Sequence, residues 1–223
     1  MSLAVDTKDC TALSDAELVE MADLCAEGSH GHEVGMLSKQ AEAWVLVTQA
    51  REEDRLKGFA FCTLERIGGT PCVLIGLASV RRTSKRDTVL RGLVTDLMRR
   101  AVLAFPDEDV LVGARFSQPG GFDAFRSLND VVPRAAHRAS GEERAWGGRL
   151  AKRFGIETSA YDQRAFLARG DGSGHAPVLD HETLHLEGIE DEVTARFDDL
   201  HAHKGDSLVA FGWAMEEELR KLA

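Results

Sequence analysis

The strongest pattern of apolar and polar positions lies between residues 73 and 116. Residues 73–80 (VLIGLASV) are almost continuously apolar, which is typical of a strand buried on both faces. A second, valine-rich stretch covers residues 109–116. Between them, apolar pairs recur at helical spacing, at 89–90, 93–94, 97–98 and 101–102. The pattern therefore predicts a buried strand, a long amphipathic helix and a second buried strand.

The flanking segments carry weaker patterns that extend this order of elements. Ser14 and Glu17 form a capping box, which marks the start of a helix. The expected helices cover 14–26, 122–128, 141–154 and 213–222, and a further short helix lies between 29 and 41. The expected further strands cover 44–48, 58–65, 165–169, 184–186 and 207–211. We therefore expect an α/β fold with a mixed central sheet flanked by helices. Residues 1–135 would form its core, and residues 136–223 a C-terminal extension that completes or extends the same domain.

Four cations stand between the first buried strand and the long helix, in residues 81–86 (RRTSKR). A loop at a helix N-terminus has unpaired backbone N–H groups, and the helix dipole adds to them, so an anion is favoured there. A solvated turn beside an acidic surface is the alternative interpretation of the same cations. We expect this loop to bind a ligand that carries phosphate.

Composition narrows the range of partners. The net charge of −10 would repel nucleic acid and anionic membrane surfaces, so we expect neither as a partner. No stretch reaches the roughly 20 apolar residues that span a bilayer, and the N-terminus lacks a signal-peptide pattern, so we expect a cytoplasmic protein. The four cysteines include no C-x-x-C pair, which favours buried free thiols over disulfides or a thiolate metal site.

The order of elements resembles the GCN5-related N-acetyltransferase fold. In that family the loop before the long helix reads [Q/R]-x-x-G-x-[G/A], and alignment of the helix starts places Lys85, Thr88 and Leu90 on its three signature positions. Lys85 keeps the charge, whereas the other two replace small residues. Phe125 stands nearest to the tyrosine that protonates the leaving thiolate in the family, and the only tyrosine, Tyr161, lies outside the similar region.

The resemblance implies coenzyme A or an acyl-coenzyme A as co-substrate and transfer of the acyl group to an unidentified amine. Backbone groups of residues 77–80 would contact the thioester, and the loop would hold the phosphates. The implied coenzyme-binding residues are Leu77, Ala78, Ser79, Val80, Arg81, Arg82, Lys85, Arg86 and Thr88. Glu65 and Ser79 are alternatives for the group that removes the amine proton, so the catalytic residues stay open. Retention of catalysis and formation of a homodimer also stay open.

Residues 181–191 (HETLHLEGIED) match H-E-x-x-H-x-x-G-x-x-D and resemble the metzincin peptidase signature. On a helix, His181 and His185 would face the same way and bind zinc, with Glu182 as general base and Asp191 as a third ligand. The period-two alternation of the segment instead predicts a strand, which would hold the two histidines about 13 Å apart. We therefore expect no metal. A zinc-dependent hydrolase is the alternative function, and a non-catalytic binding module of the same fold is the third.

Two other pairs of histidines are expected to be solvated. His30 and His32 precede a predicted helix, and His201 and His203 stand beside acidic residues near a helix end.

Overall fold

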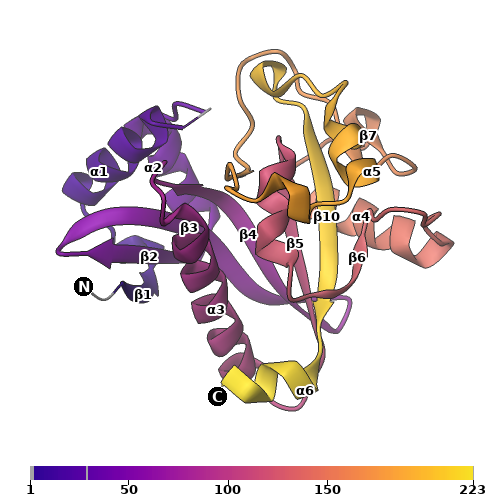
Figure 1. Cartoon of the computed structure of the whole chain (residues 1–223), viewed down its shortest axis with the longest axis horizontal. Helices are drawn as coiled ribbons and strands as arrows, with labels where there is room; N and C mark the ends of the chain where they lie inside the picture. Colours follow the sequence, from indigo (N-terminus) through magenta and orange to yellow (C-terminus); the bar gives the residue numbers. More distant parts are fainter. Residues whose placement is uncertain (1–2, 29, 223) are drawn as a thin grey trace.

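The computed structural model describes residues 3–28 and 30–222, and within them ten strands form one mixed sheet (Figure 1). Its spatial order is β1-β2-β3-β4-β9-β5-β10-β8-β7, with β6 paired to β10. The strands are β1 (Ala4–Asp9), β2 (Leu46–Glu52), β3 (Arg55–Ile67), β4 (Thr70–Val80), β5 (Val110–Phe116), β6 (Asn129–Val132), β7 (Tyr161–Asp162), β8 (Leu167–Ala168), β9 (Leu179–Asp180) and β10 (Ser207–Ala214).

Helices flank this sheet. The α-helices are α1 (Asp15–Ala26), α2 (Val34–Ala43), α3 (Arg86–Ala104), α4 (Gly141–Arg153), α5 (Asp191–Thr194) and α6 (Glu216–Leu219). Short 3-10 helices are η1 (Cys10–Ala12), η2 (Pro119–Phe125), η3 (Thr158–Ala160), η4 (Leu186–Gly188), η5 (Ala195–Phe197), η6 (Ala202–Lys204) and η7 (Arg220–Leu222). None of the helices among the described residues is long and apolar enough to cross a lipid bilayer.

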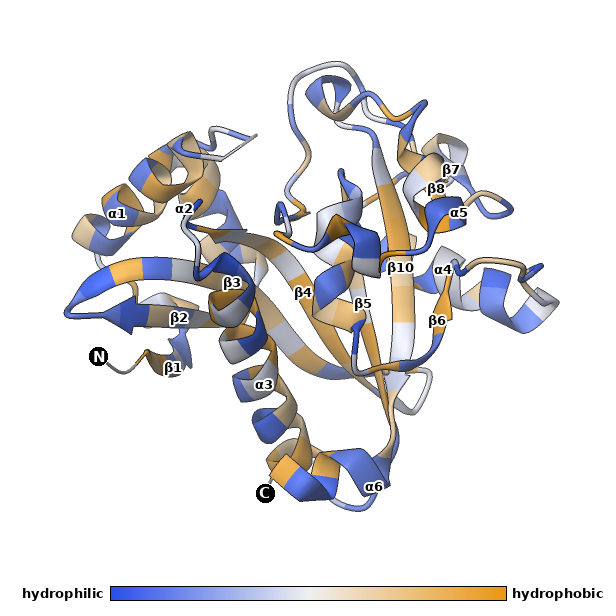
Figure 2. Cartoon of the chain, in the orientation of Figure 1, coloured by the Kyte–Doolittle hydropathy of each residue, from blue (hydrophilic) through white to orange (hydrophobic). Residues whose placement is uncertain are grey.

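The core forms where the sequence pattern is strongest. Strand β4 is buried from Pro71 to Val80, and β5 is buried along its whole length. Helix α3 turns its apolar residues, among them Leu93 and Leu97, onto β2 and β3. Figure 2 shows β4, β5 and β10 as largely apolar strands at the centre of the molecule. Burial on both faces explains why these strands read as nearly continuous apolar runs.

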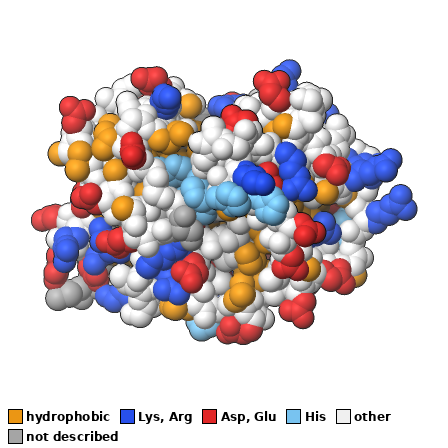
Figure 3. All heavy atoms as spheres, turned by 90° about the horizontal axis from the view of Figure 1, so that it is seen from above, with side chains coloured by type: hydrophobic (Ala, Val, Ile, Leu, Met, Phe, Trp, Pro, Cys, Tyr) orange, Lys and Arg blue, Asp and Glu red, His pale blue; other side chains and the backbone are white. Residues whose placement is uncertain are grey.

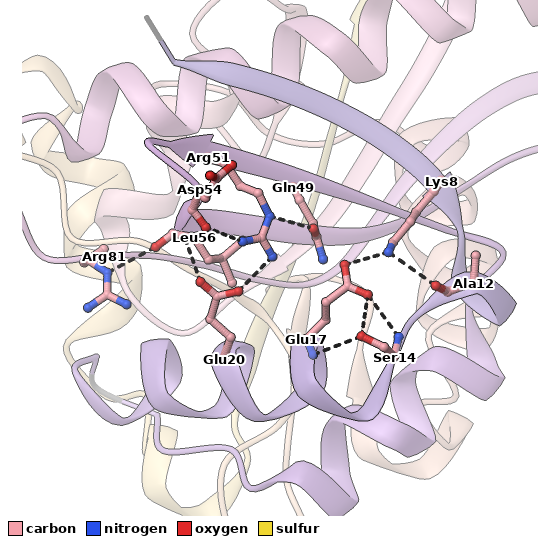
Figure 4. A network of polar contacts seen from close by, with 10 residues as sticks. All are labelled: Lys8, Ala12, Ser14, Glu17, Glu20, Gln49, Arg51, Asp54, Leu56 and Arg81. Carbon is pink, nitrogen blue, oxygen red and sulfur yellow. Dashed lines mark hydrogen bonds and ion pairs between the residues drawn. The ribbon is translucent and has the colours of Figure 1, made fainter. Parts of the chain in front are cut away.

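Helix α1 is fixed to the edge of the sheet by polar contacts (Figure 4). The capping box predicted from Ser14 and Glu17 is present, and Glu17 also accepts a hydrogen bond from Lys8 at 2.6 Å. One turn later, Glu20 accepts 2.8 Å hydrogen bonds from the Arg51 guanidinium and from the backbone N–H of Leu56. The helix is therefore attached to both strands of the β2–β3 hairpin.

The parallel strands β4 and β5 separate part of the way along their length. They pair only from Cys72 opposite Leu111 to Ile75 opposite Ala114. Beyond that point they diverge, and the two-residue strand β9 enters the gap between them. We call this gap the wedge.

The predicted fold class is confirmed, because a mixed sheet flanked by helices is present. The predicted strand at 184–186 is wrong, since residues 186–188 form the 3-10 helix η4 and the N–H of Leu184 is bound to Asp87 instead of a neighbouring strand. The short helix predicted between 29 and 41 begins at Val34, and Ser29 lies outside the described residues. Strand β1 was not predicted.

Candidate functional site

The wedge is filled by the chain itself. Strand β9 runs parallel to β4, with Ala78 opposite Leu179 and Ser79 opposite Asp180. The backbone N–H of Ala78 donates to the C=O of Val178 at 3.1 Å. Residues 77–80, which the sequence assigns to the coenzyme thioester, are buried, and part of their backbone is already hydrogen-bonded to another part of the protein.

From the wedge the same segment continues across the start of α3. Asp87, in the first turn of that helix, accepts hydrogen bonds from the N–H of Leu184 at 3.1 Å and from His181 Nε2 at 2.8 Å. On the other side, a Cβ at Gly120 of η2 would lie 2.4 Å from the C=O oxygen of His181, so only glycine lets the segment pass. Residues 178–184, which we call the cleft segment, thus connect the wedge with the N-terminus of α3.

A buried anion anchors the cleft segment. The side chain of Asp180 is 2% exposed and lies 3.2 Å from His30 Nδ1. It accepts hydrogen bonds from Arg82 Nη2 at 3.1 Å and from Gln118 Nε2 at 2.5 Å. Burial raises the pKa of Asp180, but the hydrogen bonds and charges of His30 and Arg82 outweigh it and hold this pKa below its ordinary value. The carboxylate therefore occupies a pocket that is built for negative charge.

The cations of the loop at 81–86 do not converge on one point. Arg81 pairs with Glu27 and donates to the C=O of Leu56 at 3.2 Å, at the edge of the network in Figure 4. Arg82 pairs with Asp180, whereas Lys85 pairs with Glu52 at 2.6 Å. Arg82 also lies 3.8 Å from Glu182, so these three cations of the predicted anion-binding set are divided between four separate acidic partners.

A cavity of about 480 Å³ lies at the start of α3, on the side of the β2–β3 hairpin. Thr83, Ser84, Lys85 and Thr88 line it. Glu52 also lines it and pairs there with Lys85. Of the predicted site residues, Lys85 and Thr88 therefore meet at this cavity, while residues 77–80 face the wedge.

Of the side chains considered for proton transfer, Ser79 lies in the wedge opposite Asp180, and the others lie away from the wedge or are unsuited to the role. Glu65 stands near the opposite end of β3 and pairs with Arg153 at 2.6 Å. Phe125, in the place of the family's tyrosine, has no proton to donate, and its ring packs 5.1 Å from that of Phe116. Tyr161 lies in β7 at the far edge of the sheet, and burial raises the pKa of its hydroxyl.

The H-E-x-x-H motif does not form a zinc site of the peptidase type. Residues 181–185 are not helical. His181 is fully buried against Asp87, whereas the His185 side chain is 63% exposed and pairs with Glu187 at 3.0 Å. The helical arrangement on which the hydrolase alternative depends is therefore absent from this segment.

His181 instead belongs to a different group of candidate ligands. Its ring, Asp87 and Asp123 each offer one ligand atom, and these atoms lie within 4.8 Å of one another. Such a group could hold a metal ion, although His181 and Asp87 are already hydrogen-bonded to each other.

Histidines gather at the mouth of the wedge, and sequence reasoning missed this cluster. His30 packs edge to face on His175 with 4.3 Å between ring centroids, and its ring stacks at 6.4 Å with that of His32. Figure 3 shows histidine side chains across the middle of the upper face of the molecule. The expectation that His30 and His32 are solvated is wrong, since they are 3% and 6% exposed. Burial, followed by the charges of His30 and His175, lowers the pKa of His32 to about 4.

Comparison with known protein families finds no match, and no curated protein matches the chain. Solved acetyltransferases are similar to it. The aminoglycoside 6'-N-acetyltransferase from Enterococcus faecium has a TM-score of 0.41 and 12% identity, covering 60% of this chain and 67% of its own. The NatC complex bound to Gag peptide and CoA has a TM-score of 0.44 and 12% identity, and the similarity covers 63% of this chain and 87% of the matched chain. The ribosomal-protein-S18-alanine N-acetyltransferase from Escherichia coli has a TM-score of 0.38 and 11% identity, and the similarity covers 62% of this chain and 86% of its own.

Proposed function

We propose that the protein is an acetyltransferase-like module that binds coenzyme A or an acyl-coenzyme A in the wedge, in exchange for its own cleft segment. The observation that carries the proposal is the separation of β4 from β5, which leaves a strand edge at residues 77–80 that hydrogen-bonds to an extended chain. A coenzyme arm that contains amide groups is such a chain.

The chemistry of the cleft segment supports this exchange. The extended backbone of the segment pairs with β4. The carboxylate of Asp180 contacts Arg82, His30 and Gln118. Coenzyme A offers an amide-containing arm followed by phosphates. Each feature of the segment therefore has a counterpart in the ligand, and displacement would leave few buried polar groups without partners.

The topology around the cleft segment also supports exchange. The segment belongs to a long excursion, residues 169–206, whose two ends meet. Ser207 pairs with Ala168, and the N–H of Gly172 donates to the C=O of Lys204 at 3.0 Å. Because the ends are held together, the middle can leave the wedge while β10 keeps its place beside β5. Long connections of this kind are often functional, and lids and binding loops are among them.

Calorimetric titration with coenzyme A tests the proposal. The variant Asp180→Asn weakens the anchor of the cleft segment, so we expect it to bind coenzyme A about tenfold more tightly than the wild type. Asp171→Asn is the matched control, because Asp171 is exposed in the same excursion and accepts a hydrogen bond from the backbone N–H of the nearby Ser173. Absence of binding heat in all three proteins at millimolar coenzyme would contradict the proposal.

Transfer of an acyl group to an amine is the finer part of the proposal. A non-catalytic binding module is the second candidate, and the position of Phe125 and the distance of Glu65 from the wedge favour it. Release of free thiol from acetyl-coenzyme A, measured with a panel of amines on the Asp180→Asn variant, distinguishes the two. Amine-dependent release supports an enzyme, and coenzyme binding without release supports the module.

A further inference from the structure

A second cavity, of about 500 Å³, lies at the other end of the sheet. Its walls come from the loop after β6, the first turns of α4, the turn between β7 and β8, and η5. Strand β10 lies between this region and the wedge. Its volume falls within the usual range of small-molecule sites, roughly 300–1,000 Å³.

Four arginines line this cavity: Arg138, Arg144, Arg164 and Arg196. No aspartate or glutamate is among its lining residues in the described chain. We call it the arginine cavity. In a protein of net charge −10, four guanidinium groups around one space are a marked local excess of positive charge. Such a cavity raises the local concentration of anions.

The four arginines are not neutralised by neighbours. Within residues 3–28 and 30–222, Arg138, Arg164 and Arg196 have no carboxylate within 4.0 Å, and the buried Nε of Arg196 has no hydrogen-bond partner. Arg144 donates to the C=O of Ala139 at 2.5 Å, and no carboxylate of the described chain pairs with its charge.

The acidic side chains nearby already have other partners, although one of these partners, His137, itself lines the cavity. Glu143 binds His137 at 2.9 Å and caps the start of α4. Glu190 and Glu192 accept hydrogen bonds from the backbone N–H groups of Ala135 and Ala136, at 3.2 and 2.6 Å. The charges of the four arginines therefore remain available to a ligand.

Part of the lining of the arginine cavity is apolar. Val132, Pro133 and Phe166 form it, and the ring of Phe166 lies 6.4 Å from that of Phe211 in β10. The backbone of Phe166 has φ of +59°, a conformation that bulky residues rarely adopt. A ligand that fits both surfaces has a charged group beside an apolar body.

We propose that the arginine cavity binds a small organic diphosphate of the nucleoside diphosphate class. Guanidinium groups bind phosphate oxygens in pairs, and the hydrogen bonds are strengthened by charge. A single phosphate would leave part of the positive charge of four arginines unmatched, whereas a diphosphate reaches more of them. The apolar part of the lining takes the body of the ligand. This proposal does not depend on the function proposed for the wedge.

Calorimetry on the full chain with orthophosphate, pyrophosphate and ADP tests the proposal. We expect one saturable site for pyrophosphate, binding about tenfold weaker for orthophosphate, and binding of ADP at least as tight as that of pyrophosphate. Equal binding of orthophosphate and pyrophosphate, or the absence of saturation, would overturn the proposal.

Two double variants make the test specific. Arg138→Gln with Arg164→Gln removes two exposed cavity arginines and should weaken pyrophosphate binding about tenfold or more. Arg91→Gln with Arg99→Gln makes the same change of charge on the exposed face of α3 and should leave binding within about twofold. An equal loss in both would mean that only net charge matters, and the site would be rejected. The loss of pyrophosphate binding caused by Arg138→Gln with Arg164→Gln should be the same with and without Asp180→Asn, so failure here and failure at the wedge are distinguishable.

Discussion

The wedge and the arginine cavity differ in whether their arginines have acidic partners. In the wedge, Arg82 lies against Asp180, an anion that the chain supplies from 98 residues further along the sequence. In the arginine cavity, the described residues supply no such anion to Arg138, Arg164 and Arg196, which line the same space. The positive charge of Arg82 is thus matched within the chain, whereas the arginine cavity keeps an excess of positive charge. Substitution of one arginine in each region should therefore have opposite effects on stability.

The largest effect is expected in the wedge. Arg82→Gln leaves the Asp180 carboxylate, 2% exposed, without its guanidinium partner. Removal of one member of a buried pair costs about 3–5 kcal/mol, so the free energy of unfolding should fall by that amount in urea denaturation. Arg81→Gln is the control, because its partner Glu27 is 41% exposed and the loss should stay below about 1 kcal/mol. Equal losses would show that Asp180 does not depend on Arg82.

The second effect concerns pH. The pKa of His32 is about 4 in the folded protein, below the ordinary 6.5, because burial and the neighbouring His30 and His175 disfavour its charged form. The folded state therefore binds fewer protons than the unfolded state, so this contribution to stability is complete above pH 6.5 and is lost as the pH falls toward 4. We expect a loss of roughly 3 kcal/mol across this window. Denaturation as a function of pH measures it.

Two variants separate the effect of His32 from general acid denaturation. His32→Gln should flatten the slope of stability against pH between 4 and 6.5. His185→Gln should leave the slope intact, since that side chain is 63% exposed. A slope that persists in His32→Gln would assign the pH dependence to other groups.

A smaller effect is expected at Gly120. A Cβ there would lie 2.4 Å from His181 C=O and 2.7 Å from Thr183 N–H, so Gly120→Ala should force the cleft segment outward. We expect a loss of about 1–3 kcal/mol and faster proteolysis within residues 169–206. Gly35→Ala, where a Cβ meets nothing within 4 Å, is the control and should be neutral or slightly stabilising. Unchanged proteolysis in Gly120→Ala would mean that the segment adjusts without leaving.

The smallest effect, of opposite sign, is expected in the arginine cavity. Arg164→Gln reduces repulsion among the cavity arginines and should raise the free energy of unfolding by about 0.3 kcal/mol at low salt and by less at high salt. Arg99→Gln on α3 gives the baseline for loss of one exposed charge. A net loss of stability in Arg164→Gln relative to that baseline would show that the cavity arginines do not repel one another.

The regions that the sequence predicts well are those with local signals. The capping box of Ser14 and Glu17, the buried strand β4 and the amphipathic helix α3 each follow from patterns within a few residues. The basic loop was located correctly for the same reason. Its chemistry was harder to predict, because the partners of Arg81, Arg82 and Lys85 come from distant parts of the chain.

The elements that the sequence misses depend on long-range pairing. Strand β9 has two residues, too few for any periodicity, and becomes a strand only because β4 and β5 separate there. The polar strand β1 is defined by its pairing with β2. The histidine cluster joins His30 with His175, and no spacing in the sequence connects them. One useful signal was nevertheless present in residues 169–206. This long excursion contains glycines and the H-E-x-x-H motif, which fits no local helix or strand. Such a segment is expected to pack into a site formed by other parts of the chain.

Hydrogen exchange of the cleft segment, with and without coenzyme A, tests the central claim most directly. The backbone N–H of Leu184 is bound to Asp87, and the segment as a whole is largely buried. If the coenzyme takes the place of the segment, saturating coenzyme A should speed exchange of the amides in residues 179–184 while those of residues 77–80 in β4 stay protected. Unchanged exchange in residues 179–184 at saturating coenzyme would contradict the account.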